Sequence, residues 1–321
     1  MTQMARILIT GATGFVGRRL CGVLRDQGHA VLAVVRDATT NCASLPADET
    51  IPMGELSGDT QWDAKLLNRV DAIVHLAARV HVLKDEAANP AAEFHRINVG
   101  ATEALARAAV GRAKRFVYVS SLHAMRTLTT ERLTEASVCE PDGPYSQSKL
   151  DAEVVVRQIG LETGLETVIV RPPPVYGPGH RGRLMSLFQF AKWGLPLPLG
   201  GIDNRRSLVF VDNLASALLE CAVNPRALGQ TFLISDGEDV SLSELVARMG
   251  RALGRRSWLL PAPVGLIRGI ARLAGKSDSA DRLFGSLVVD SQFIRRQLDW
   301  QPPYSMDAGL RVTANWMKGA A

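Results

Sequence analysis

The 321-residue sequence has little of what marks membrane, metal-binding or disulfide-stabilised proteins. Its four cysteines lie far apart and form neither a CxxC pair nor a cluster with histidine; they are Cys21, Cys42, Cys139 and Cys221. We therefore expect reduced thiols, a cytoplasmic location and no metal site. No apolar stretch of about 18 residues is free of charges, and residues 1–6 are short and polar, so we expect neither a membrane-spanning segment nor a signal peptide.

A strong net charge is also missing, because 37 Lys and Arg stand against 32 Asp and Glu, for a net +5. The basic residues are scattered and lack aromatic partners, so we expect no binding of nucleic acid. A mildly basic protein suits an anionic small molecule instead. The hydrophobic share of 46% is that of a globular protein, and the length allows one large domain or a domain with an added lobe.

The first half of the chain alternates short β-branched runs with helix-period segments. Strands are expected at residues 5–10, 30–35, 72–76, 115–120 and 167–171. Helices are expected at residues 15–27, 90–110 and 145–163. This alternation predicts an α/β fold with a doubly wound parallel Rossmann sheet.

After Arg171 the pattern changes, because three consecutive prolines and a glycine-rich loop interrupt the alternation. Short strands near residues 207–211 and 230–234 are expected to return to the sheet, and residues 240–289 to be helical. We read the basic, apolar segment 264–274 as a helix of this region rather than a membrane-surface helix. The prediction is a Rossmann domain at residues 1–172, with returning segments near 207–236, and a smaller, mostly helical substrate-binding lobe at residues 173–206 and 237–321.

A glycine-rich turn directly follows the first expected strand and opens the first expected helix. Gly11 allows the tight turn, Gly14 lets the backbone approach a pyrophosphate, and Gly17 lets the helix pack closely on the strand. The N-terminus of the helix offers free N–H groups and a partial positive charge to an anion. The turn therefore predicts a dinucleotide site.

The second expected strand ends at Arg36 and Asp37. An acidic residue at this point accepts hydrogen bonds from the adenine ribose of NAD, whereas an arginine pairs with the 2′-phosphate of NADP. Arg36 therefore favours NADP(H), and Asp37, one position later, leaves NAD(H) open.

Tyr145 and Lys149 stand four residues apart at the start of an expected helix, so they share one face. A tyrosine whose pKa is lowered by a nearby ammonium, and by the positive ring of a cofactor, exchanges a proton with a substrate oxygen. On a solvated helix the same pair would be unremarkable. Ser121, however, ends an apolar strand where a nicotinamide would lie. We therefore interpret Ser121, Tyr145 and Lys149 as the catalytic residues.

These motifs, with Arg171-Pro172 and segments 175–179, 206–212 and 298–300, resemble the extended short-chain dehydrogenase/reductases, the family of nucleotide-sugar epimerases, dehydratases and ketoreductases. The resemblance implies an enzyme that acts on a UDP-sugar, and a homodimer formed through helices 90–110 and 145–163. Cofactor contacts are implied for Gly11, Thr13, Gly14, Phe15, Val16, Gly17, Leu76, Ala77, Ala78, Asn98, Tyr145, Lys149 and Pro172. Substrate contacts are implied for Arg79, His123, His180, Arg206 and Arg282. A packing role stays open for His123, a mobile loop position for His180 and a plain surface position for Arg206.

One departure from the family pattern bears on the reaction. Sugar 4,6-dehydratases carry Thr-Asp-Glu where this chain has Ser121-Leu122-His123, and a leucine is neither acid nor base. Segments 232–238 and 281–287 resemble bacterial reductases of UDP-4-keto-6-deoxy-N-acetylglucosamine. We therefore expect NAD(P)H-dependent reduction of the C4 keto group of such a sugar for surface polysaccharide, such as the O-antigen of lipopolysaccharide. The alternatives are a UDP-sugar 4-epimerase with tightly bound NAD and, more remotely, a non-catalytic NADP(H)-sensing protein.

Overall fold

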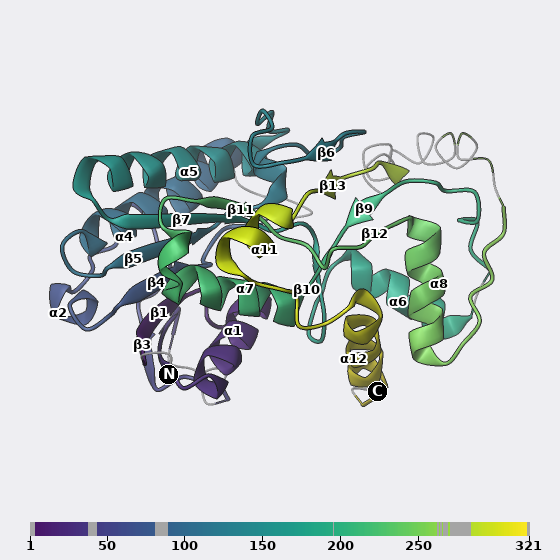
Figure 1. The fold of residues 1–321 in the computed structure, drawn as a ribbon, viewed down its shortest axis with the longest axis horizontal. Coiled ribbons are helices and arrows are strands. Elements are labelled where there is room, and N and C mark those ends of the chain that lie inside the picture. Colours follow the sequence, from purple (N-terminus) through teal and green to yellow (C-terminus); the bar gives the residue numbers. More distant parts are fainter. Residues whose placement is uncertain are drawn as a thin grey trace.

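The computed structural model describes residues 4–37, 44–80, 89–194, 196–261, 263, 265, 269 and 284–319. Its centre is a seven-stranded sheet in the order β11-β7-β5-β4-β1-β2-β3, with every neighbouring pair parallel (Figure 1). The strands are β1 (Arg6–Thr10), β2 (Ala30–Val35), β3 (Glu49–Pro52), β4 (Ala72–His75), β5 (Arg115–Val119), β7 (Glu166–Arg171) and β11 (Thr231–Leu233). The predicted doubly wound parallel fold is confirmed.

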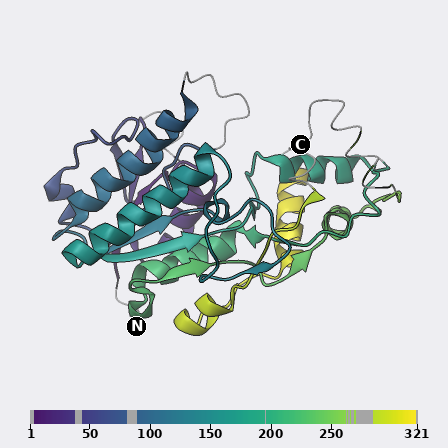
Figure 2. The same cartoon turned by 90° about the horizontal axis from the view of Figure 1, so that it is seen from above.

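Helices cover both faces of this sheet (Figure 2). Alternate residues of β1 explain the two layers: Ile7 and Ile9 belong to one core, and Leu8 belongs to the other. The first core lies under α1 (Phe15–Asp26), α7 (Val211–Val223) and α11 (Gln292–Leu298). The second lies under α2 (Ala64–Leu67), α4 (Ala101–Ala109) and α5 (Pro144–Thr163). A strand buried on both faces needs this continuous apolar sequence.

The helix expected at residues 90–110 consists of three consecutive parts. It runs as α3 (Pro90–Phe94), a wider π-helical turn (His95–Gly100) and α4. Turns of this type occur mostly as single insertions, often at functional sites. The turn contains Asn98, whose side chain is buried.

A third core lies beside the sheet and defines the C-terminal lobe. It is built from α6 (Arg183–Trp193), α8 (Leu242–Leu253) and α12 (Met306–Gly319) (Figure 1). Single turns of 3₁₀ helix lie at Leu122–Ala124 and Pro225–Ala227. No helix in the described ranges is long and apolar enough to cross a membrane.

Two of the expectations for the second half need correction. Segment 230–234 does join the sheet as β11, but segment 207–211 does not, because β11 already occupies the edge beside β7. The chain there forms small two-stranded sheets instead; β9 (Arg206–Ser207) pairs with β12 (Asp239–Val240), and β10 (Val209–Phe210) pairs with β8 (Val175–Tyr176). Of the region expected to be helical, residues 240–289, α8 is a helix and residues 254–261 are not. The end of the region is a strand, β13 (Val288–Val289), which pairs with β6 (Arg132–Leu133). Most of segment 264–274 lies outside the described residues.

Candidate active site

The glycine turn between β1 and α1 has no room for side chains. Gly11 has φ +69°, and a Cβ added there would lie 2.8 Å from the backbone nitrogen of Ala77. A Cβ on Gly17 would lie 2.2 Å from the carbonyl oxygen of Gly11. Gly14 caps α1 with no side-chain hydrogen bond, and the first turn of α1 has no acidic residue. The N-terminus of the helix therefore faces outward as an anion site of the kind that holds a pyrophosphate.

The other predicted cofactor residues gather around this turn. Leu76, Ala77 and Ala78 follow β4, and the contact with Gly11 places them beside the turn. Thr13 is exposed and Phe15 half-buried, and Val16 packs into the core below. Arg36 directly follows β2 and is exposed. Since the carboxyl ends of parallel strands meet at one edge of a sheet, these residues fit an extended dinucleotide.

A buried hydrogen-bond chain, which the sequence analysis missed, runs behind the cofactor residues. The Thr10 hydroxyl lies 2.7 Å from Nδ1 of His75, and Nε2 of His75 lies 3.1 Å from Oγ1 of Thr102. Thr102 donates its only proton to the Asn98 carbonyl at 2.6 Å, so it accepts from His75. Burial lowers the pKa of His75, so Nδ1 carries no proton and accepts from the Thr10 hydroxyl, which itself accepts from the backbone N–H of Ala77. His75 is therefore neutral and carries its proton on Nε2.

This neutral histidine makes stability depend on pH. Burial, helped by the charge of Lys149, lowers the pKa of His75 from 6.5 to about 3. Between these values the unfolded chain holds the proton and the folded chain does not, so stability falls as the pH falls, by about 1.4 kcal/mol per unit. We expect urea denaturation to show a loss of about 2 kcal/mol between pH 6.5 and pH 5.

The matched variants for this prediction are His75→Gln and His95→Gln. Glutamine at position 75 cannot titrate, so we expect lower stability at neutral pH and a flatter dependence below it. His95→Gln removes an exposed imidazole instead of the buried one, so it controls for the loss of a histidine as such. An equal slope in the wild type and in His75→Gln would contradict the assignment.

Asn98 uses its side chain to hold the segment that follows Ala78. Its Oδ1 accepts from the backbone N–H of Arg79 at 2.7 Å, and its Nδ2 donates to the Arg79 carbonyl at 3.1 Å. Nδ2 also donates to the hydroxyl of Ser148 at 2.9 Å. The Arg79 guanidinium lies over the ring of Phe94, 5.4 Å from its centroid. In the protein alone, Asn98 thus links the cofactor segment to α5.

Helix α5 brings Tyr145 and Lys149 to the end of β5. Lys149 is 2% exposed and donates from Nζ to the Val119 carbonyl at 2.8 Å. Nζ also lies 4.4 Å from the centroid of the Tyr118 ring. Burial lowers the pKa of Lys149 to about 7, against the opposing charge of Glu153. Lys149 is thus poised to hold or release a proton near neutral pH.

Tyr145 and Ser121 meet across the site. Burial raises the pKa of Tyr145, and a side-chain hydrogen bond with Ser121 lowers it, with a net rise. The expected lowering by Lys149 is therefore not found in the protein alone. Two physical reasons explain this. The Lys149 ammonium donates its hydrogen bond to the Val119 carbonyl, and the positive cofactor ring, which was part of the expectation, is present only when the cofactor is bound.

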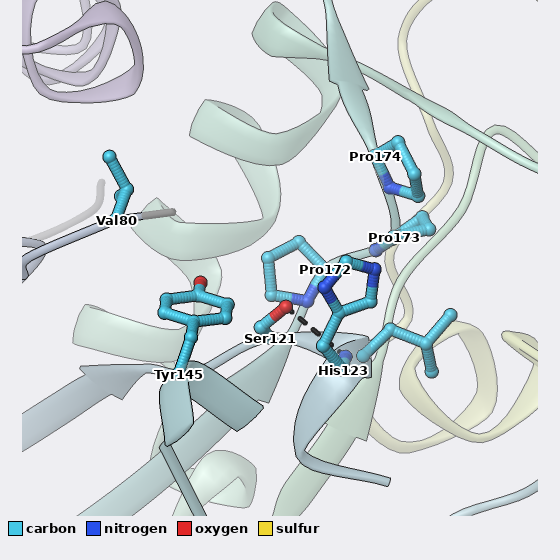
Figure 3. A pocket seen from close by; sticks show the side chains of 8 residues that line it. Val80, Ser121, His123, Tyr145, Pro172, Pro173 and Pro174 are labelled. Carbon is cyan, nitrogen blue, oxygen red and sulfur yellow. Dashed lines mark hydrogen bonds between the residues drawn. The ribbon is translucent and has the colours of Figure 1, made fainter. Parts of the chain in front are cut away.

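A cavity of about 280 Å³ opens in front of these two hydroxyls (Figure 3). Its walls are mostly apolar; the lining residues are Val80, Ser121, Leu122, His123, Tyr145, Pro172, Pro173 and Pro174. The His123 ring stands edge-on to Tyr145, with centroids 6.3 Å apart, and its backbone N–H donates to Oγ of Ser121. Ser121, Tyr145, Pro172 and His123 thus share one cavity, as a site for a substrate and its reacting oxygen requires.

Two further predicted substrate residues, His180 and Arg206, do not line this cavity. His180 packs against Phe15 of the glycine turn, with ring centroids 5.3 Å apart. Arg206 lies in β9 of the small sheet, away from the residues that line the cavity. Arg282 lies outside the described residues. Within the described ranges, no three His, Cys, Asp or Glu side chains are placed to bind a metal ion.

Comparison with known proteins agrees with this geometry. The model of the NAD dependent epimerase/dehydratase family matches residues 7–235. The chain belongs to this family. A UDP-glucose 4-epimerase from Vibrio cholerae is 36% identical over 313 residues, covering 96% of this chain and 94% of the relative. A dTDP-glucose 4,6-dehydratase from Neisseria meningitidis serogroup B is 30% identical over 338 residues, covering 98% of this chain and 93% of the relative.

Solved structures share the fold of this family member. A UDP-N-acetylglucosamine 4-epimerase from Bacillus cereus superposes with a TM-score of 0.79 at 22% identity, covering 98% of this chain and 100% of the other. A UDP-glucuronic acid 4-epimerase from Bacillus cereus, in complex with UDP-glucuronic acid and NAD, gives 0.77 at 20% identity, with the same coverage. The chain is an extended short-chain dehydrogenase/reductase, an NAD-dependent enzyme of the nucleotide-sugar epimerase/dehydratase type.

Proposed function

We propose that the protein is a UDP-sugar 4-epimerase that keeps NAD bound between turnovers. This was the alternative in the sequence analysis, and two observations now favour it over the 4-keto reductase. The Vibrio cholerae relative, similar over nearly the whole length of both chains, is a UDP-glucose 4-epimerase. The cavity in front of Tyr145 and Ser121 has mostly apolar walls, and this second observation carries the proposal.

The apolar walls matter because an epimerase has to let its substrate turn. NAD, when bound, supplies the acceptor and then the donor of the hydride at C4. Tyr145 and Ser121 are fixed to the protein, so returning the hydride to the opposite face of C4 requires the sugar ring to turn over between the two transfers. Walls of valine, leucine and proline give the ring few polar anchors, and the nucleotide part remains to hold the substrate in the protein.

In this proposal each catalytic residue has one task. Tyr145 takes the proton from the C4 hydroxyl and returns it after the ring has turned. Ser121 donates a hydrogen bond to the same oxygen, and in the NAD-bound enzyme the Lys149 ammonium and the positive cofactor ring together would favour the ionised form of Tyr145. Dehydration would also need an acid and a base beside C5 and C6, and the described residues that line the cavity include no carboxylate.

The bound cofactor provides the first test. Protein purified without added nucleotide is expected to release NAD on denaturation, in an amount close to one per chain. Addition of a UDP-hexose is then expected to produce the fluorescence of reduced cofactor without any consumption of added NADH or NADPH. Protein that purifies free of nucleotide and consumes added NADPH stoichiometrically with a 4-keto sugar would instead be the reductase.

Arg36 favours the reductase, because it stands exposed at the end of β2, where a 2′-phosphate would lie. A reductase that uses NADPH predicts that Arg36→Ala raises the Kd for NADPH by about tenfold, the effect of about 1.4 kcal/mol from a lost charge-assisted pair. Binding of NADH would change little. If the protein is the epimerase, Arg36→Ala is expected to change the Kd values for NADPH and NADH by the same small factor. Isothermal titration calorimetry on protein freed of bound nucleotide distinguishes the reductase from the epimerase.

The proposal also covers substrate binding, dimer formation and the use of the product. The lobe at residues 173–206 and 237–321 would bind the UDP-sugar, with Arg206 and Arg282 at the diphosphate. A homodimer would form through the helices at residues 90–110 and 145–163. The product would serve the synthesis of surface polysaccharide.

A further inference from the structure

Glu153 is a buried carboxylate that the proposed chemistry does not use. It is 0% exposed, and Arg171, at 2% exposed, binds it through two hydrogen bonds, of 2.9 Å from Nε and 2.6 Å from Nη2. The Ser120 hydroxyl donates to the same carboxylate at 2.6 Å. Arg157, which reaches the surface, donates to it at 3.2 Å. Each carboxylate oxygen therefore has two donors, and the group is fully satisfied.

The position of Glu153 ties together the three elements that build the site. Tyr145, Lys149 and Glu153 occupy successive turns on one face of α5. They bind in turn the Ser121 side chain, the Val119 carbonyl and the Ser120 hydroxyl, three consecutive residues at the end of β5. Arg171 ends β7 and directly precedes Pro172 of the cavity wall. The ion pair thus links α5 and the ends of β5 and β7, which carry Ser121 and Pro172 of the cavity wall.

Glu153 also stands one helical turn from Lys149, and its charge raises the pKa of that group against the effect of burial. The other groups packed around Lys149 supply no negative charge: His75 on β4 is neutral, Tyr118 on β5 is a phenol whose pKa is raised by burial, and Tyr145 is likewise raised. Arg171, on β7, is a cation. Among the described residues, Glu153 is therefore the one carboxylate whose charge raises the pKa of Lys149.

We propose that Glu153 is a positioning residue with two effects: through Ser120 and Arg171 it sets the place of Ser121 and Pro172, and it holds a negative charge one helical turn from Lys149. A merely structural pair does not need charge, because well-packed apolar residues stabilise a buried site equally well or better. The first of its two tests, an enzyme assay, rests on the proposed function. The second test measures the stability of the protein and needs no activity.

The test compares three variants with the wild type. Glu153→Gln keeps the shape and the acceptor for Ser120 but removes the charge. Because it leaves Arg171 buried without a counter-ion and risks misfolding, Glu153→Gln/Arg171→Met removes both charges together. Arg157→Gln is the matched control, because it removes the exposed partner of the same carboxylate.

The first readout is the pH profile of kcat/KM. Loss of the Glu153 charge lowers the pKa of Lys149, so the fall in activity on the alkaline side is expected to begin at lower pH in both Glu153 variants and to stay in place in Arg157→Gln. The shift is expected to be smaller in the double variant, because that variant also loses the Arg171 cation. Any nucleotide-sugar oxidation or epimerisation by the wild type suffices for this comparison. If the wild type turned out to be a reductase, the proposed function would fail while the shift of the profile would still decide the inference.

The second readout needs no activity. Lysine titrates near 10.4 in the unfolded chain, and the lower pKa of folded Lys149 makes stability rise with pH between the two values. In both Glu153 variants this rise is expected to begin at lower pH than in the wild type, in urea denaturation between pH 6 and pH 9. Unchanged pH dependence in the folded double variant, in both readouts, would overturn the charge role of Glu153.

Discussion

Replacement of Tyr145 by phenylalanine is expected to reduce turnover by about 10²–10⁴-fold, the range that a positioned acid–base group contributes. The phenol hydroxyl is the group that meets Ser121 at the mouth of the cavity, and phenylalanine keeps the ring contacts with Phe94 and His123. The cofactor is therefore expected to stay bound. Steady-state epimerisation rates and the amount of NAD in the purified variant provide the measurement.

A second tyrosine supplies the control for this variant. Tyr304 packs its ring against Phe210 in the C-terminal lobe, with centroids 5.3 Å apart, so Tyr304→Phe removes a hydroxyl far from the cavity wall. Its turnover is expected to stay close to that of the wild type. If Tyr145→Phe kept most of the wild-type rate with NAD bound, Tyr145 would not be the proton donor and acceptor.

Replacement of Gly17 by alanine is expected to have the second large effect. The added Cβ would lie 2.2 Å from the Gly11 carbonyl oxygen and 2.8 Å from Cα of Ala12, both backbone atoms, so α1 has to move away from the turn. Overpacking of this kind costs about 1–3 kcal/mol. We expect lower thermal stability and an NAD affinity reduced by about tenfold or more, because each 1.4 kcal/mol is a factor of ten.

Helix α1 contains its own control for this prediction. A Cβ on Gly22 would meet only the Pro46 side chain, at 3.8 Å. Gly22→Ala removes a glycine from a helix interior, so it is expected to raise stability by about 0.5–1 kcal/mol with unchanged NAD binding. Equal NAD affinities in Gly17→Ala and the wild type would show that the close packing of α1 on the turn is not needed to bind the cofactor.

The parts of this protein that the sequence predicts well are those in which the signal is local. The glycine turn, the pair Tyr145 and Lys149, and the strands of the parallel sheet each depend on residues a few positions apart, and the structure has them close to the expected bounds. The prediction that segment 207–211 joins the sheet was wrong, because the edge beside β7 is occupied by another part of the chain, β11. The π-helical turn at Asn98 was missed because periodicity does not reveal one inserted residue.

The site residues that were missed have partners far away in the chain. His75 directly precedes the predicted cofactor residues at 76–78, but its role depends on Thr10 and Thr102, from β1 and α4. Glu153 depends on Arg171, at the end of β7. One signal was available for Glu153: it is a charged residue eight positions after Tyr145, on the same buried face of α5, where an unpaired charge would be costly.

The reaction itself could not be read from the catalytic residues, because epimerases and 4-keto reductases use the same serine, tyrosine and lysine. The resemblance of the C-terminal segments favoured the reductase, and the comparison over the whole chain favours the epimerase. Arg36 at the end of β2 does not distinguish between them without binding data. The decision therefore depends on what happens to the hydrogen at C4.

The most direct measurement follows a deuterium label at C4 of UDP-glucose or UDP-N-acetylglucosamine, incubated with the purified protein and no added nucleotide. The account predicts that proton and deuterium NMR will show a mixture of both C4 configurations, with the label still on C4 in each, because the hydrogen leaves and returns within one site. An unchanged C4 configuration in both sugars, together with stoichiometric use of NADPH when a UDP-4-keto-6-deoxy sugar is supplied, would contradict it.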